Sequence, residues 1–304
     1  MTRRPSNGNA GSGRRVLLVF LAVVAGVAGY WFCARKAARA PEPGPAPAPV
    51  PSRPSPTAAA APPRPSGVPV DFEAASGTQR GVVAIVIDDV GWDDTALAPL
   101  ATLDAPLALS ILPGTPRADE AIALARRKGW DLMVHLPMEP ESGKAEKETI
   151  RLSDDDAAIR ARVLGALARV PGAIGINNHQ GSKATADPRV LRDVLLVVKE
   201  KGLFFLDSRT TPATQGATTA HALGVPFLSR DVFLDDAAAE AKDPAGAPGA
   251  LDAAWERAVA LATSKGEAVV IGHPHRETVA FLAAALPKLA ARGVRPVKVS
   301  ELVP

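Results

Sequence analysis

The sequence has 304 residues, of which 47% are hydrophobic, and this length suits one domain of a little over 200 residues with additional segments. Residues 1–70 hold nine of the 35 Lys and Arg but one of the 32 Asp and Glu, so the rest carries 26 basic and 31 acidic residues, a net charge of −5. A mildly acidic body argues against binding to nucleic acid, which depends on neutralising phosphates. Cys33 is the single cysteine, which excludes an intrachain disulfide.

The amino-terminal segment has the pattern of a membrane anchor. Residues 1–15 contain four arginines, and residues 16–34, VLLVFLAVVAGVAGYWFCA, contain no charge. As a helix these residues would span about 28 Å, close to the thickness of the hydrocarbon layer of a bilayer. A cleaved signal peptide is the alternative, although Pro41 is a poor neighbour for cleavage after Ala40. The arginine-rich lead predicts a single-pass protein of the inner (cytoplasmic) membrane, with residues 1–15 in the cytoplasm and the body on the periplasmic side.

A linker rich in proline and alanine is expected over residues 35–80. Twelve of the 29 prolines lie between Pro41 and Pro69. Such a sequence has too little apolar surface to fold and favours extended polyproline conformations. We expect a disordered, semi-rigid spacer.

The first element of the body is an apolar run, residues 82–87, that ends in Asp88 and Asp89. Its β-branched and small residues are typical of a strand buried on both faces of a parallel sheet. Ligand sites of α/β folds lie at the carboxyl ends of strands, where adjacent acids can turn toward one site. Two solvated loop acids are the alternative interpretation.

From there, apolar runs alternate with amphipathic stretches, and no internal repeat is present. This alternation predicts a (β/α) barrel or a large doubly wound sheet. The strands are expected at 82–87, 107–112, 131–136, 173–177, 203–207, 224–228, 268–272 and 297–300. The helices are expected at 94–102, 116–128, 154–169 with Ser153 as its cap, 188–201, 251–264 and 277–291.

Polar residues at the predicted strand ends favour the barrel, because barrel enzymes draw catalytic residues from several strands. A lone histidine is more often a satisfied core or loop residue, but four of five histidines lie at these ends or in their loops. One carboxylate with two imidazoles is a common ligand set for catalytic zinc, and we therefore expect a divalent metal, zinc above all. The strand-end residues are Asp88, Asp89, His135, Asn177, Asn178, His179, Asp207, Ser208 and His273.

Six ordered motifs resemble those of the divergent polysaccharide deacetylase family: VAIVIDDVG, LSILPGTP, MVHLPMEP, GINNHQGS, FFLDSRT and IGHPHRET. The resemblance covers about residues 80–304, and implies that residues 81–304 are a deacetylase-like catalytic domain. It implies a distorted seven-stranded (β/α) barrel and metal-dependent removal of an acyl group from an N-acetylated sugar. In the family's pattern Asp88 is the base, Asp89 a metal ligand, His273 the general acid and Asp207 an aspartate that supports the site.

The chain departs from the superfamily in two places. The superfamily's His-x-x-x-His motif reads here from His135 to Glu139, and its arginine-proline motif has no clear counterpart. Either Glu139 or His179 is therefore the third ligand. We favour Asp89, His135 and His179, because a ligand fixed at a strand end loses less conformational freedom than one on a loop.

Three functions are weighed. The first is a membrane-anchored, metal-dependent deacetylase whose partners are a cell-envelope polysaccharide, its substrate, and the membrane. The second is a non-catalytic glycan-binding or scaffold protein, which the absent arginine-proline motif favours. The third is a receiver-type signalling domain, which chain length, export and His135 in place of a phosphoacceptor aspartate argue against. Trp92 either stacks on a sugar or belongs to the core.

Overall fold

A computed structural model of the chain describes residues 80–92, 96–235 and 249–304. The predicted tail at 1–15, the predicted anchor at 16–34 and all but the last residue of the predicted linker lie outside the described residues. Within these ranges no helix combines the length and the apolar character that crossing a membrane requires.

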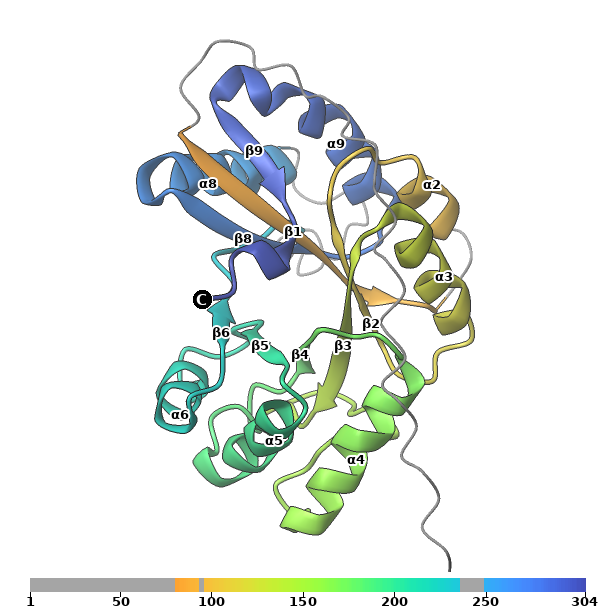
Figure 1. Cartoon of the computed structure of the whole chain (residues 1–304), viewed down its shortest axis with the longest axis vertical. Helices are drawn as coiled ribbons and strands as arrows, with labels where there is room; N and C mark the ends of the chain where they lie inside the picture. Colours follow the sequence, from red (N-terminus) through yellow and green to blue (C-terminus); the bar gives the residue numbers. More distant parts are fainter. Residues whose placement is uncertain (1–79, 93–95, 236–248) are drawn as a thin grey trace, which may run out of the picture. The chain divides into compact units, whose positions relative to one another are not determined.

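The body is built on one sheet in which every strand pairing is parallel (Figure 1). The strand order is β6-β5-β4-β3-β2-β1-β8-β7, and β9 pairs with β1 beside β2. The first strand therefore lies inside the sheet and pairs with three other strands. The strands are β1 (Gly81–Val90), β2 (Ala108–Ile111), β3 (Asp131–Met138), β4 (Gly175–Gln180), β5 (Phe204–Asp207), β6 (Phe227–Ser229), β7 (Val232–Phe233), β8 (Glu267–Gly272) and β9 (Val294–Val297).

The two strands at the ends of this order, β6 and β7, are joined by Arg230 and Asp231 alone. The backbone N–H of Arg230 donates to the carbonyl of Asp207 on β5, and that of Asp231 donates to Val269 on β8. Since this short link reaches from one end of the strand order to the other, the sheet is strongly curved. The protein is a parallel α/β half-barrel.

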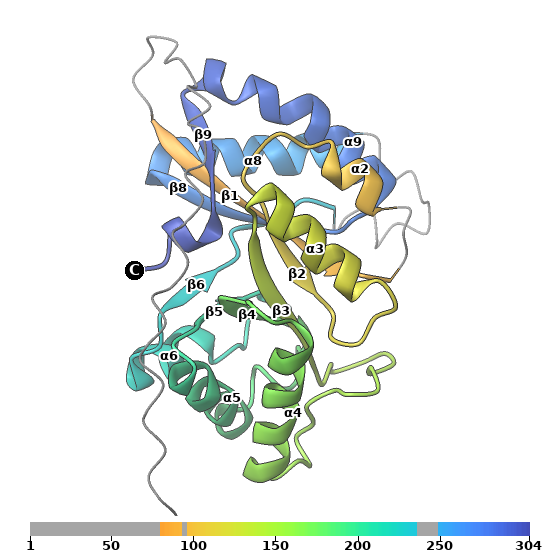
Figure 2. The same ribbon diagram turned by 45° about the vertical axis from the view of Figure 1, so that its right-hand side comes forward.

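Helices lie along the outer side of the curved sheet (Figure 2). Asp155 caps α4 by accepting a hydrogen bond from the backbone of Ala158, so the cap predicted at Ser153 is wrong by two residues. The helices are α2 (Leu97–Ala101), α3 (Ala118–Lys128), α4 (Asp156–Arg169), α5 (Pro188–Glu200), α6 (Gly216–Leu223), α8 (Ala250–Lys265) and α9 (Arg276–Ala285). Three short 3-10 helices follow: η1 (Leu286–Lys288), η2 (Ala290–Arg292) and η3 (Val299–Glu301).

The core lies on both faces of the sheet. Along β1, Val83, Ile85 and Ile87 pack into the layer between sheet and helices, while Ala84 and Val86 pack into a smaller cluster inside the curve. Val299 of η3 belongs to this inner cluster, so the carboxyl terminus fills part of the concave side. The prediction of a first strand buried on both faces is confirmed.

The carboxyl-terminal elements differ from the prediction. The last strand is β9, not 297–300, because Gly293 ends η2 with a left-handed φ of 70° and Val294 pairs at once with Gly81. The helix predicted at 277–291 ends as an α-helix at Ala285, since Pro287 has no N–H to continue the α-helical hydrogen bonds. Helix α6 and strand β7 were not predicted.

Candidate metal centre and its neighbouring acids

Two adjacent carboxylates turn toward one imidazole at the end of β1. Asp89 has a φ of 55°, in the left-handed region that non-glycine residues rarely adopt, and the pairing of β1 with β2 is irregular between Ile87 and Val90. This interrupts the pleat, so neighbouring side chains need not point to opposite faces. His135 Nε2 lies 3.2 Å from Asp89 Oδ1 and 3.6 Å from Asp88 Oδ2.

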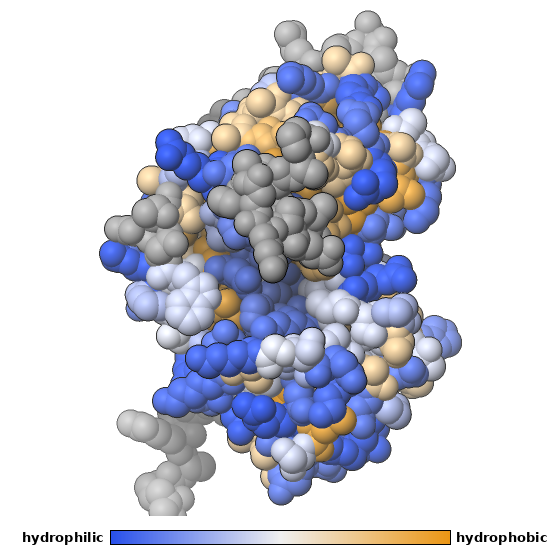
Figure 3. Space-filling model, turned by 180° about the vertical axis from the view of Figure 1, so that it is seen from behind, coloured by the Kyte–Doolittle hydropathy of each residue, from blue (hydrophilic) through white to orange (hydrophobic). Residues whose placement is uncertain are grey.

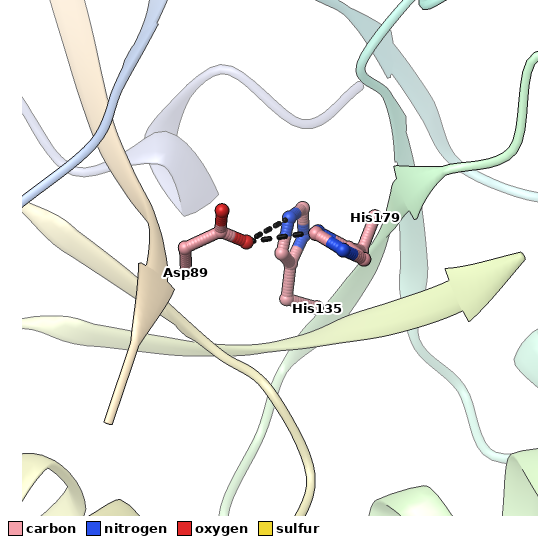
Figure 4. Close-up of side chains that lie close together, drawn as sticks. All are labelled: Asp89, His135 and His179. Atoms are coloured by element: carbon pink, nitrogen blue, oxygen red, sulfur yellow. Dashed lines mark ion pairs between the residues drawn. The ribbon is translucent and has the colours of Figure 1, made fainter. Parts of the chain in front are cut away.

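Asp89, His135 and His179 converge from three strands or strand ends (Figure 4). His179 Nδ1 lies 2.8 Å from Asp89 Oδ1, and the two imidazole rings meet edge to face with centroids 4.9 Å apart. Each of the three side chains offers one ligand atom, and these atoms lie within 4.8 Å of one another. Parallel pairing of β3 with β4 brings the two histidines side by side, because His179 is in register with Pro137, two residues beyond His135.

The donors present fit a divalent cation. Asp89 Oδ1 is buried, and in the described part of the chain no group donates a well-directed hydrogen bond to it. This carboxylate and the two imidazoles beside it together form a ligand set that suits zinc. Burial by itself raises the pKa of Asp89, but the attraction of the neighbouring His135 and His179 imidazoles outweighs it and lowers that pKa. The carboxylate is therefore ionised, as a ligand must be.

Glu139, the alternative third ligand, has other partners. Its Oε1 pairs with Lys183 Nζ at 2.6 Å, and its Oε2 accepts a hydrogen bond from the backbone of Leu152 at 2.7 Å. The hydrogen bond from Lys183 holds the pKa of Glu139 below its usual value. The carboxylate of Glu139 therefore links two loops. The side chain that contacts Asp89 is that of His179.

Asp88 is almost completely buried, with a side chain only 1% exposed. The amide of Asn177 donates to both of its oxygens, at 2.8 and 2.9 Å. Burial raises the pKa of Asp88, and neighbouring His135 and His273 and the Asn177 amide offset only part of that rise. A buried carboxylate with a raised pKa is a better proton acceptor than a solvated one.

His273, at the end of β8, forms a dyad with Asp235. His273 Nδ1 lies 2.8 Å from Asp235 Oδ1, and Asp235 Oδ2 accepts hydrogen bonds from the His273 backbone N–H and the Thr278 hydroxyl. Burial lowers the pKa of His273, but the Asp235 carboxylate outweighs it and raises that pKa to about 9. His275 is the third member of this second Asp-His-His group.

Asp235 was missed from the sequence. It is 2% exposed and follows β7, a strand of two residues that is too short to show alternation. A signal was present, since the apolar residues 232–234 end in two acids, as the first strand does.

The carboxylate of Asp207 is engaged by the loop that follows β5. Its Oδ1 accepts from the backbone of Arg209 at 2.8 Å, and its Oδ2 accepts from the Thr214 hydroxyl at 2.7 Å. These contacts hold the loop between β5 and α6, in which Arg209 has a φ of 50°. The supporting role implied for Asp207 therefore acts through this loop, and its place in catalysis stays a prediction.

Known proteins match most of the chain. The sequence profile of the divergent polysaccharide deacetylases matches residues 85–303. Two uncharacterized proteins align with 68% of this chain: YibQ of Escherichia coli, 35% identical, and a protein of Haemophilus influenzae, 36% identical. The alignments span 63% of YibQ, less than two thirds of its length, and 71% of the Haemophilus protein.

A solved structure shares the fold. An uncharacterized protein of Agrobacterium tumefaciens superposes with a TM-score of 0.68 at 22% sequence identity, over 75% of this chain and 91% of its own.

Proposed function

Since the chain belongs to the divergent polysaccharide deacetylase family, we propose that it is a metal-dependent deacetylase acting on N-acetylated sugars of a cell-envelope polysaccharide. The observation that carries the proposal is the convergence of three potential zinc ligands with a buried acid, Asp88. We propose the half-barrel as a distorted (β/α)7-type barrel, with this site at the carboxyl ends of its strands.

The residues divide the work of amide hydrolysis. Asp89, His135 and His179 would hold a zinc ion, which when bound polarises a carbonyl and lowers the pKa of a water molecule. Asp88 receives the proton of the attacking water, for which its raised pKa suits it. His273 has Nδ1 engaged by Asp235, so its Nε2 is the atom that donates a proton to the leaving amine. A pKa of about 9 keeps that proton in place at neutral pH.

A groove beside Trp92 suits a sugar ring. Trp92 is 53% exposed, whereas the other two described tryptophans, Trp130 and Trp255, are buried. A pyranose has an apolar C–H face that matches an indole ring and hydroxyls that match a polar rim. The groove has a volume of about 340 Å³ and is lined by Trp92, Leu112, Pro113, Gly114, Thr115, Pro137, Glu146, Lys147, Glu148 and Arg169. One face of the protein is also hollowed, and hydrophilic residues surround this hollow (Figure 3).

The proposed test separates metal binding from turnover in the full-length protein. Metal is removed with a chelator, zinc is titrated back, and release of acetate from an N-acetylglucosamine oligosaccharide is measured. Asp89→Asn should lose zinc, because an amide cannot supply the charge, whereas Asp88→Asn should keep zinc and lose turnover. Equal loss of zinc in both variants would contradict these roles. Zinc and oligosaccharide binding without release of acetate would instead support the glycan-binding protein without catalysis.

Two further variants test the third ligand. His179→Ala should weaken zinc affinity strongly, while Glu139→Gln should change it little, since Glu139 already pairs with Lys183. The opposite ranking would move the site to His135 and Glu139.

A further inference from the structure

We infer that Asn177 is a positioning residue whose single amide group couples the metal ligand His135 to the base Asp88 and selects the nitrogen that His135 offers to a metal. The roles of these two neighbours rest on the proposed function. The contacts of Asn177 do not.

Asn177 lies on β4 and is fully buried, in register with His135 on the neighbouring strand. Its Nδ2 donates to both carboxylate oxygens of Asp88 at 2.8 and 2.9 Å, and lies 3.2 Å from the hydroxyl of Ser208. Its Oδ1 accepts a hydrogen bond from the Ser110 hydroxyl and lies 3.0 Å from His135 Nδ1. One side chain therefore contacts residues of β1, β2, β3 and the end of β5.

The orientation of this amide is fixed by its neighbours. A carboxylate only accepts hydrogen bonds, so the Asn177 edge that faces ionised Asp88 must be the NH₂ group. A reversed amide would place an oxygen against two buried carboxylate oxygens, at the cost of an unpaired charge. The carbonyl Oδ1 is therefore the atom that faces His135.

The tautomer of His135 follows from that orientation. An oxygen 3.0 Å from a ring nitrogen pairs with it only if the nitrogen carries a proton, so His135 Nδ1 is the protonated nitrogen. With the Nδ1 proton held by Asn177, Nε2 is the nitrogen that a metal ion can bind, after giving up any proton it carries, and it lies 3.2 Å from Asp89 Oδ1. A hydrogen bond to the second nitrogen is how proteins commonly orient a metal-binding histidine.

The two histidines therefore differ. His179 approaches Asp89 Oδ1 with Nδ1, at 2.8 Å, whereas His135 approaches the same oxygen with Nε2. We expect a divalent ion to be held by Nε2 of one ring and Nδ1 of the other.

The same amide acts on Asp88. Because Asn177 is neutral, it holds both oxygens of the carboxylate in place without adding a positive charge that would make it a weaker base. The base Asp88 and the ligand His135 are thus held by opposite ends of the planar Asn177 amide. A substitution of Asn177 is therefore expected to affect both residues.

The experiment uses full-length protein labelled with ¹⁵N at histidine and loaded with zinc. Ring-nitrogen spectra should show one zinc-bound histidine with a protonated Nδ1, assigned to His135 by its loss in His135→Gln, and one with a protonated Nε2, assigned to His179. Zinc held by Nδ1 of His135 would overturn the proposal, and this measurement needs no variant of Asn177.

Two substitutions separate the ends of the amide. Asn177→Asp keeps an acceptor for His135 but replaces the donor to Asp88 with a second carboxylate oxygen, which raises the pKa of the pair and disables Asp88 as a base. The Nδ1 signal of His135 should persist while turnover falls about 100-fold or more at an unchanged KM. Asn177→Leu removes both, and zinc affinity should also fall about 10-fold to 100-fold, as for other residues that orient metal ligands. A folded Asn177→Leu variant with unchanged zinc affinity would contradict the coupling.

Asn178 provides the matched control, because it is equally buried on the same strand but contacts Gln180, Thr210 and the backbone of Ser208. Asn178→Asp should leave the His135 spectrum and zinc affinity unchanged, and an equal effect in both would reduce Asn177 to a structural role. If the wild type shows the expected spectrum but releases no acetate, the coupling stands and the proposed deacetylase activity falls.

Discussion

Replacing Asp235 by Asn tests the second acid-histidine pair. The Asp235 side chain is 1% exposed and that of His273 is 22% exposed, so solvent screens their attraction only weakly. Asn keeps the size and one acceptor of Asp but removes its charge. We expect the pKa of His273 to fall toward the 6.5 of an unperturbed imidazole.

The magnitude follows from the pKa of His273. A rise from 6.5 to about 9 corresponds to about 3.4 kcal/mol of stabilisation of the protonated form, at about 1.36 kcal/mol for each tenfold change. Asp235 is the foremost of the groups that raise this pKa, with smaller contributions from Asp88 and Asp89. The Asp235 carboxylate is therefore the largest single source of this stabilisation.

The direction of the pKa shift of His273 sets the pH range over which it stabilises the folded protein. Because folding raises the pKa of His273, its stabilisation is complete below about pH 6.5 and is lost as the pH rises through about 9. Wild-type protein should lose free energy of unfolding across this window, and Asp235→Asn should lose much less. The measurement is urea unfolding of metal-free full-length protein at intervals from pH 6 to pH 10, with the ring-proton shift of His273 as a direct readout.

The control is Asp231→Asn, which removes a charge from the same segment. Asp231 accepts from the backbone of Val269 and pairs with Lys265, so its loss should not change the pH dependence in this window. Equal slopes for Asp235→Asn and wild type, with His273 still titrating near pH 9, would refute the assignment of the raised pKa to Asp235.

Other expectations concern packing, substrate and topology. Gly216→Ala should destabilise the fold by about 1–3 kcal/mol, because its Cβ would lie 2.3 Å from Asp207 Oδ2. Gly165→Ala in α4 should stabilise the fold by about 0.5–1 kcal/mol, because its Cβ would enter open space. Thermal unfolding of the two variants compares these effects. Trp92→Ala should weaken binding of an N-acetylglucosamine oligosaccharide about tenfold in a fluorescence titration while zinc affinity stays constant, and equal binding would remove Trp92 from the substrate site. A reporter that works only outside the cytoplasm should be active when fused after Pro304, and activity of a cytoplasm-only reporter there would overturn the proposed anchor at residues 16–34.

Much of the fold could be predicted because most strands are apolar runs ended by polar residues. The runs that contain β1, β3 and β8 can be recognised by their length and by the glycines next to them. Strand β7, with two residues, and helix α6, which follows the threonine-rich loop at 210–214, give no comparable pattern. The last strand was misplaced because its Pro296 disfavours a strand by propensity, while pairing with the first strand overrides that preference.

The residues of the candidate site that lie at strand ends could be predicted. Asp88, Asp89, His135 and His179 stand where apolar runs stop, and the parallel sheet brings such positions to one edge. The direction in which Asp207 points depends on the loop around Thr214, and the partner of His273 depends on how the chain returns through Asp235. The strand ends mark Asp207 and His273 as candidates, but their partners Thr214 and Asp235 are set by the path of the chain beyond the strands. That path has no periodic pattern from which it could be predicted.

The three partners of β1 become available at different times during synthesis, since β2, β8 and β9 follow it at very different distances along the chain. Val82 pairs with Glu267, 185 residues later (267 minus 82), and Gly81 pairs with Val294, 213 residues later (294 minus 81). The first strand therefore finds these neighbours only late in synthesis. Until then one side of an apolar strand is an open edge, which is prone to pair with other chains. The acids at its end reach their final places late, and a chain cut short before residue 267 would keep Asp88 and Asp89 yet lack the strands that hold them.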